Sequence, residues 1–232
     1  MLEEKGTYQE YNRIFPLVKN YVYEKEENLE ELGLLKNSRI GNSVYILQDR
    51  EKKNIAYRIY RTYRRKNTND IREASFQQNL LEYGKDIKDI DFPYGVITKD
   101  NHIIGQVIPF YEDKKELVEE EKPYPYLLES YQLIKELYEH GIYYIDIHGR
   151  NFLIEKNHVK LIDFDPNLVI FQSKMKMMNH YYHRQIAWNF SRMAQTLLRD
   201  NYDVDSFDRV DTLKDLENVL LSVIEKPKVK KK

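Results

Sequence analysis

The chain has 232 residues, enough for one large domain or two small lobes with a sizeable core. Hydrophobic residues make up 41% and charged residues 32%, which argues against wholesale disorder. The absence of cysteine excludes disulfides, thiolate zinc sites and a cysteine nucleophile, and it fits a cytoplasmic protein. With a net charge of −1 and no stretch near the ~20 apolar residues of a membrane span, we expect neither a nucleic-acid partner nor a transmembrane segment.

The first half of the chain predicts mostly strands. Residues 1–30 are polar and mixed, and we expect an N-terminal extension with some helix. The runs RIGNSVYIL (39–47) and NIAYRIY (54–60) flank a polar turn and predict an antiparallel hairpin. The stretch NDIREASFQQNLLEYG (69–84) has apolar residues at helical spacing and predicts one helix. YGVIT and HIIGQVIPF, around the turn KDN (99–101), predict two further strands.

The composition changes to a charged stretch near Tyr111, which predicts a sheet-rich part at 31–110 and a more helical part at 111–232. YLLESYQLIKELYEHG predicts a helix that ends before Gly141. NFLIE and VKLIDF, joined by the turn KNH (156–158), predict a second hairpin. A long helix is expected over 177–198.

Three oxygen-bearing side chains flank this second hairpin. Asp146 follows an apolar run, Asn151 comes five residues later, and Asp163 ends the second strand. The hairpin should fold its two ends together, so that Asn151 and Asp163 offer hard oxygen ligands that suit Mg²⁺ carrying substrate phosphates. The remaining carboxylate, Asp146, could then accept a proton from an incoming hydroxyl group.

The spacing D-x-H-x-x-N, here DIHGRN, followed by an apolar hairpin and KLIDF resembles the catalytic core of the protein-kinase-like superfamily, over roughly residues 33 to 200. The superfamily includes protein kinases and small-molecule kinases of the aminoglycoside-phosphotransferase type. The resemblance implies an α+β, bilobal fold, with an antiparallel-sheet N-lobe that contains one helix and a mainly helical C-lobe. It also implies ATP- and Mg²⁺-dependent transfer of the γ-phosphoryl group to a hydroxyl acceptor, either a protein or a small molecule. Asp146 would be the catalytic base, and Asn151 and Asp163 would hold the metal.

The same resemblance implies nucleotide-binding residues upstream. Gly41 would let the backbone approach the phosphates, while Val44 and Ala56 would cover the adenine. Arg58 stands where the family has its phosphate-binding lysine, and Glu73, fifteen residues later, would be its helix partner. Arginine keeps the positive charge, but it is longer and planar, so the geometry for transfer could be lost.

The hinge between the implied lobes would be supplied by HIIGQVIPFYE. Ile108 would lie at the nucleotide, and the carbonyl of Pro109 and the N–H of Tyr111 would read the adenine edge. Proline is acceptable there because the position needs a carbonyl group alone. Tyr144 and Ile145 replace the His-Arg that precedes the catalytic Asp in regulated protein kinases, which favours an unswitched enzyme.

Plainer interpretations stay open for several of these residues. Asp146 could be a turn residue and Asn151 a helix or loop cap. Glu73 could complete a capping box with Asp70 as the N-cap, and Arg58 could be an ordinary exposed strand arginine. His148 could bond the loop backbone or take a direct part in the site.

Three further patterns favour simple structural roles. Trp188 is predicted to be a packing residue and not part of a cofactor box, HYYH (180–183) to form one wet face of a helix, and the basic tail 226–232 to be solvated. Two functions compete with phosphoryl transfer. The arginine at 58 and the single glycine of the loop favour a nucleotide-binding pseudokinase or scaffold, and the same site residues could serve an AMP transferase.

Overall fold

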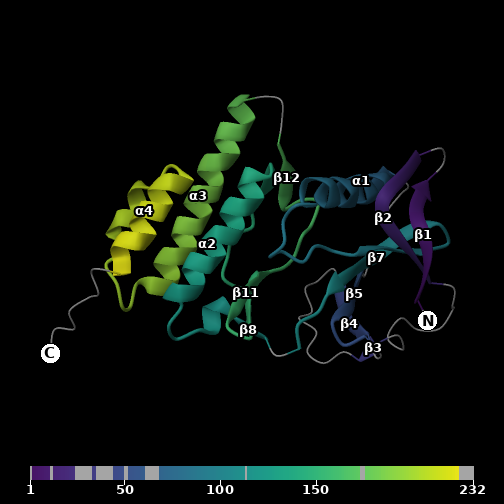
Figure 1. The fold of residues 1–232 in the computed structure, drawn as a ribbon, viewed down its shortest axis with the longest axis horizontal. Coiled ribbons are helices and arrows are strands. Elements are labelled where there is room, and N and C mark those ends of the chain that lie inside the picture. Colours follow the sequence, from purple (N-terminus) through teal and green to yellow (C-terminus); the bar gives the residue numbers. More distant parts are fainter. Residues whose placement is uncertain are drawn as a thin grey trace. The chain divides into compact units, whose positions relative to one another are not determined.

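The computed structural model describes residues 2–10, 13–23, 33–34, 44–49, 52–60, 68–112, 114–172 and 176–224. The chain is a mixed α+β protein (Figure 1). Its internal contacts divide it into two compact units, Met1–Lys85 with Phe92–Glu112 and Asp86–Asp91 with Asp113–Lys232.

The first unit contains one seven-stranded sheet and one helix. The sheet order is β1-β2-β6-β7-β5-β4-β3. Its elements are β1 (Leu2–Glu10), β2 (Arg13–Tyr23), β3 (Gly33–Leu34), β4 (Val44–Asp49), β5 (Ile55–Tyr60), α1 (Thr68–Tyr83), β6 (Gly95–Lys99) and β7 (His102–Pro109).

The hairpin and the two further strands predicted in this unit are confirmed. β4 and β5 pair antiparallel from Val44 opposite Tyr60 to Gln48 opposite Ala56. β6 and β7 also pair antiparallel, and the turn between them holds Asp100 at φ 50° and Asn101 at φ 62°. Asp and Asn tolerate this left-handed conformation better than most residues, which is why a KDN turn can connect the strands so tightly.

The expectation of helix within residues 1–30 is wrong for the part that the structure describes. β1 and β2 form an antiparallel hairpin, and β2 runs parallel to β6, from Lys19 opposite Gly95 to Val22 opposite Thr98. In Figure 1, β1 and β2 lie at the outer side of the sheet. The pairing joins segments more than 70 residues apart, so local periodicity carries no signal for it.

Each face of the sheet has its own core. Tyr23, Tyr57, Ile59, Ile97 and Val107 are among the buried residues that pack together on one face. On the other face α1 packs through Ala74 against a cluster that contains residues of β1, β2, β6 and β7. Because strand side chains alternate between faces, neighbouring residues of β5 belong to opposite cores.

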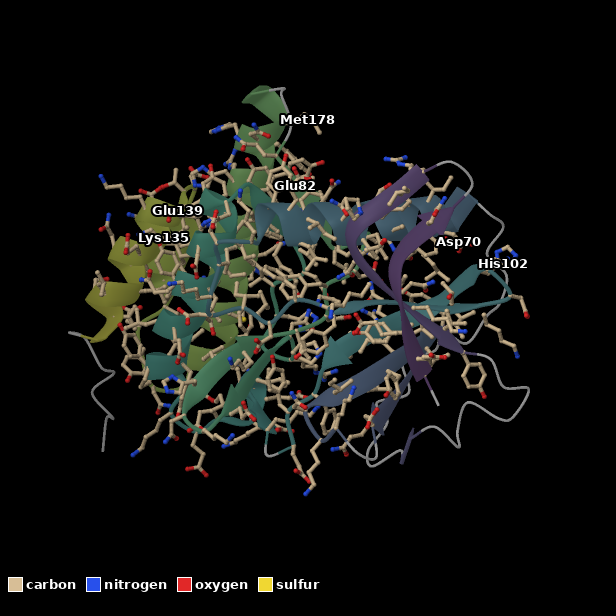
Figure 2. The ribbon with its side chains drawn as sticks, turned by 45° about the vertical axis from the view of Figure 1, so that its right-hand side comes forward. Asp70, Glu82, His102, Lys135, Glu139 and Met178 are labelled. Atoms are coloured by element: carbon tan, nitrogen blue, oxygen red, sulfur yellow. The ribbon has the colours of Figure 1, made fainter. Side chains whose placement is uncertain are left out.

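The α1 helix occupies the region predicted for it, but Asp70 is not its N-cap. The helix begins at Thr68, so Asp70 lies in its first turn. Its side chain is 1% exposed, and its Oδ2 lies 2.9 Å from Nδ1 of His102 on β7. Figure 2 shows these two side chains next to each other. Asp70 therefore ties the helix start to the sheet.

The second unit is mainly helical. Its elements are β8 (Lys114–Glu116), the short 3-10 helix η2 (Leu117–Glu119), α2 (Tyr124–Glu139), β9 (Ile142–Tyr144), β10 (Phe152–Glu155), β11 (His158–Leu161), β12 (Val169–Phe171), α3 (Lys176–Leu198), the 3-10 helix η3 (Asp205–Arg209) and α4 (Leu213–Ile224). The helices predicted at 126–141 and 177–198 are confirmed as α2 and α3, and the predicted second hairpin as β10–β11.

Helices α2, α3 and α4 pack against one another (Figure 1). Tyr131 of α2 and Phe152 of β10 both meet the ring of Phe190 on α3 edge to face, and all three side chains are fully buried. Gly141 follows α2 with φ 76°, a conformation that glycine adopts without steric cost, and it turns the chain directly into β9. In the ranges that the structure describes, no helix has both the length and the hydropathy to cross a membrane.

The prediction that residues 180–183 form a wet helix face is wrong for His183. Its ring lies 4.6 Å from that of Tyr138 on α2, and its Nε2 accepts a hydrogen bond of 3.2 Å from the backbone N–H of Leu213, where α4 begins. Burial and the neighbouring His180 lower the pKa of His183 below its usual 6.5, against a smaller opposing effect of Asp215. Neutral His183 thus links all three long helices of this unit.

We predict that this link makes the helical unit less stable in mild acid. Protons bind the unfolded state more tightly, because the folded pKa of His183 lies below 6.5. The stabilisation is complete above pH 6.5 and is lost as the pH falls through the folded pKa. The test is urea unfolding of wild type and His183→Gln. The variant should have a lower free energy of unfolding than the wild type at pH 7.5, and this difference in free energy should be smaller at pH 5.5. His158→Gln, an exposed control, should show no such narrowing, and a constant gap for His183→Gln would contradict the prediction.

Candidate active site

Asp146 and Asn151, the first and last residues of the DIHGRN motif, lie on one short loop. Asp146 comes two residues after the end of β9, and Asn151 comes directly before β10. The carboxylate of Asp146 is half-buried, with 33% of its side chain exposed, whereas Asn151 is buried at 5%. The loop therefore presents one reachable carboxylate above one buried amide.

The amide group of Asn151 fixes the position of Asp146. Its Nδ2 lies 2.9 Å from Oδ2 of Asp146 and 3.0 Å from the backbone oxygen of the same residue. It also donates to the hydroxyl of Tyr144 at 2.8 Å. Nitrogen is the donor in all of these bonds, so the amide oxygen Oδ1 takes part in none of them. Asn151 is thus a structural clamp for the loop, and its oxygen is the atom that a cation would bind.

Tyr144 connects this loop to the end of the hairpin. Its hydroxyl donates to the backbone oxygen of Ile162 at 2.9 Å and accepts from Asn151. Its ring is 1% exposed and meets Phe164 edge to face, with centroids 5.6 Å apart. From the sequence, Tyr144 was interpreted as a replacement that removes a regulatory arginine motif. The sequence signal for this second role is the tyrosine within the apolar run just before Asp146.

The hairpin brings Asp163 next to Asn151 in the backbone ladder. β10 and β11 pair with Phe152 opposite Leu161, and the ladder continues with a 2.9 Å bond from the N–H of Ile162 to the oxygen of Asn151. Asp163 follows at once, half-buried and with φ 68°. A left-handed residue other than glycine costs about 1–3 kcal/mol, and such residues concentrate at functional sites. The strained residue here is the one expected to bind the metal.

His148 also contacts the Asp146 carboxylate. Its Nε2 lies 3.2 Å from Oδ2 of Asp146, and 47% of its side chain is exposed. The ring therefore lies within ion-pair distance of the carboxylate, and the backbone oxygen of His148 accepts a hydrogen bond from the N–H of Asn151. Of the two interpretations that the sequence left open, the geometry favours a direct part in the site.

The predicted phosphate-binding pair lies in the first unit. Arg58 is at the centre of β5, opposite Gln106 of β7, and its side chain is half-buried. It alternates with Tyr57 and Ile59, which belong to the other core, so Arg58 points to the face that α1 covers. It is therefore not an ordinary exposed arginine.

Glu73 lies on α1 over the same face. Its side chain is 5% exposed, and Oε2 accepts a hydrogen bond of 3.2 Å from the hydroxyl of Tyr60, two residues after Arg58 on β5. With Asp70 inside the helix, the capping-box interpretation of Glu73 loses its partner. Glu73 and Arg58 thus share the space between the sheet and α1.

The predicted adenine-binding residues lie in β5, at the end of β7 and just after it. Ala56 is fully buried and pairs with Ile108, and Pro109 is the next residue along β7, opposite Ile55. Tyr111 follows with a buried side chain. Gly41 lies outside the described residues, and of Val44 the structure describes the backbone, in β4.

The structure brings the predicted residues together in two groups, one in each unit. Asp146 and Asn151 are in hydrogen-bond contact in the second unit, with Asp163 next to Asn151 in the ladder. Arg58, Glu73 and the adenine residues belong to the first unit.

The donor set of the second group fits magnesium better than a transition metal. Within the described ranges no three His, Asp or Glu side chains are grouped to hold a metal ion by themselves. Asn151 and Asp163 offer one amide oxygen and one carboxylate. Mg²⁺ usually keeps several waters and binds through one or two protein oxygens together with substrate phosphates, so two ligands are sufficient.

No protein-family model matches the chain, and no curated protein matches it significantly. The function of the chain is therefore inferred from the chemistry and geometry of its own residues.

Tyr144→Phe tests whether the hydroxyl bridge supports the site. The change leaves the oxygen of Ile162 without its donor and removes one acceptor from Asn151. We predict a loss of about 1–3 kcal/mol in the free energy of unfolding, measured with urea. Tyr181→Phe is the matched control, because its side chain is 60% exposed and its loss should be within about 0.5 kcal/mol. Equal stabilities of the two variants would show that the bridge contributes nothing.

Proposed function

We propose that this protein is an ATP- and Mg²⁺-dependent phosphotransferase that moves the γ-phosphoryl group to a hydroxyl acceptor. The observation that carries the proposal is the hydrogen bond from Asn151 to Asp146, with His148 3.2 Å from the same carboxylate, at the base of a hairpin whose far strand is followed by the left-handed Asp163. One half-exposed carboxylate stands beside two oxygen ligands, which is the division of roles that phosphoryl transfer requires.

The arrangement of elements supports the resemblance to the protein-kinase-like superfamily. The first unit has strands β3 to β7 in the order β3-β4-β5-β7-β6, all antiparallel, with one helix between β5 and β6. The second unit is mainly helical and carries the motif hairpin. Both agree with the implied sheet-rich and helical lobes, and the β1–β2 hairpin is an addition to them.

In the proposed reaction Asp146 orients the acceptor hydroxyl and takes its proton. Its Oδ2 accepts a hydrogen bond from Asn151 and lies 3.2 Å from Nε2 of His148, so the second oxygen, Oδ1, is the one available to the hydroxyl. Asn151 and Asp163 would hold Mg²⁺, which when bound neutralises phosphate charge. Arg58 would bind phosphate oxygens with a guanidinium that is charged at every physiological pH, and Glu73 would orient it. Positioning and charge then supply most of the acceleration.

Labelled nucleotide distinguishes the proposal from its two rivals. With ATP labelled at the γ-phosphate, we expect the label to leave the nucleotide. With ATP labelled at the α-phosphate, we expect the label to stay with the nucleotide. Both experiments are done with Mg²⁺ or with Mn²⁺. Label transferred from the α-phosphate would instead establish an AMP transferase. Nucleotide binding, measured by calorimetry, without release from either position would establish the pseudokinase or scaffold.

Substitution of the two acidic residues should separate chemistry from binding. Asp146→Asn should keep Mg-ATP binding and lower γ-phosphoryl transfer by roughly a hundredfold to ten-thousandfold, because a positioned base is lost. Asp163→Asn should weaken the binding of Mg-ATP itself, since a metal ligand is lost. The control is Asp200→Asn, which removes one exposed carboxylate just after α3. Full transfer activity in Asp146→Asn would refute the role of this residue.

A further inference from the structure

A cavity of about 530 Å³ opens beside the motif loop, within the second unit. Its walls come from three elements: the loop itself, η2 and one face of α3. The lining residues that matter below are Val118, His148, Arg150, Trp188, Asn189 and Arg192. A volume in the range of about 300–1,000 Å³ is typical of small-molecule sites.

Trp188 forms an exposed aromatic wall of this cavity. The sequence favours a packing role for this residue, and the structure leaves 56% of it exposed. Arg192, one helical turn later, lies with its guanidinium 5.5 Å from the centre of the Trp188 ring. Residues four apart share one helix face, so the flat indole and the cationic group are presented together.

The charge of the cavity is positive. Arg150 and Arg192 line it, and none of the described lining residues is acidic. Arg184 pairs with Asp211 and Arg199 with Asp200, but among the described residues neither Arg150 nor Arg192 forms an ion pair with a carboxylate. Two arginines without a carboxylate partner make a site for an anion, since guanidinium groups bind carboxylates and phosphates in bidentate fashion.

The cavity is joined to the proposed base by one direct contact and to the preceding residue by a second. His148 lines the cavity and lies 3.2 Å from Oδ2 of Asp146. Asn189 of α3 also lines it and donates a 2.6 Å hydrogen bond to the backbone oxygen of Ile145, the residue before Asp146. A molecule bound against α3 would therefore lie beside the loop that carries Asp146.

We infer that this cavity binds the phosphoryl acceptor, and that the acceptor is a small molecule with both a hydroxyl and an anionic group, either a carboxylate or a phosphate. The inference rests on the proposed function and names its substrate class. Arg150 and Arg192 bind the anion, and Trp188 packs against the carbon skeleton. In the transfer step the acceptor oxygen forms a bond to the γ-phosphorus, the bond from that phosphorus to the β,γ-bridging oxygen breaks, ADP leaves with the electron pair, and Asp146 takes the proton.

The single tryptophan of the chain, Trp188, makes the test direct, because emission excited at wavelengths that tyrosine does not absorb comes from this cavity wall alone. The probes are two matched pairs, gluconate with sorbitol and glucose 6-phosphate with glucose, titrated without nucleotide. We expect at least one anionic probe to change the emission saturably and to bind about tenfold or more tightly than its neutral partner, as expected for charge-assisted hydrogen bonds. The pair that responds identifies the anion as carboxylate or phosphate.

The double variant Arg150→Gln with Arg192→Gln should remove the anion preference, and Arg199→Gln should keep it. Arg199 carries the same charge but pairs with Asp200 away from the cavity lining. Because Arg150 and Arg192 are both exposed, the double variant should fold, which circular dichroism checks. Equal binding of anionic and neutral probes by the wild type, or an unchanged preference in the double variant, would overturn the inference.

A second measurement separates this inference from the proposed function. Release of γ-label from ATP is followed with and without the anionic probe that binds. Label release without any anion preference at Trp188 would overturn the acceptor site and leave the phosphotransferase proposal standing. Anion binding without any release of γ-label would overturn the role of the cavity as an acceptor site together with the proposed function, because no transfer would then take place.

Discussion

The hydrogen bond from the amide of Asn151 to the carboxylate of Asp146 is the contact on which the site depends. It spans 2.9 Å between a buried side chain and a half-exposed one, so the position of the reactive group is set from the interior. The same nitrogen reaches Tyr144, whose hydroxyl continues to Ile162. A buried network of this kind is rigid when its members are satisfied, which is what a positioned carboxylate needs.

The motif loop is held from two sides, and each side serves a different part of the proposed chemistry. On the hairpin side, the ladder between β10 and β11 continues to Asn151 and places Asp163 beside it. On the helix side, Asn189 of α3 bonds the backbone oxygen of Ile145. The hairpin would thus carry the metal ligands, and α3 would line the acceptor site. Asp146 lies on the loop that contacts both elements.

The first unit shows how strand alternation assigns roles within one short run. Along β5, Tyr57 and Ile59 enter one core, while Arg58 and Tyr60 point to the face under α1, where Tyr60 bonds Glu73. A shift of one residue would exchange these two sets. The pairing of β5 with both β4 and β7 prevents that shift, and it keeps Arg58 on the face that carries Glu73.

The sequence by itself determined the elements whose signals are local. Alternation and turn residues predicted both hairpins, helical spacing predicted α1, α2 and α3, and the DIHGRN spacing selected Asp146, Asn151 and Asp163. The tertiary structure alone decided what depends on distant segments: the parallel pairing of β2 with β6, the packing of His183 between helices, and the exposure of Trp188 in a cavity that Arg150 also lines. The physical reason is that periodicity records which face of an element is apolar, whereas the partner of that face is chosen by contacts across the whole unit.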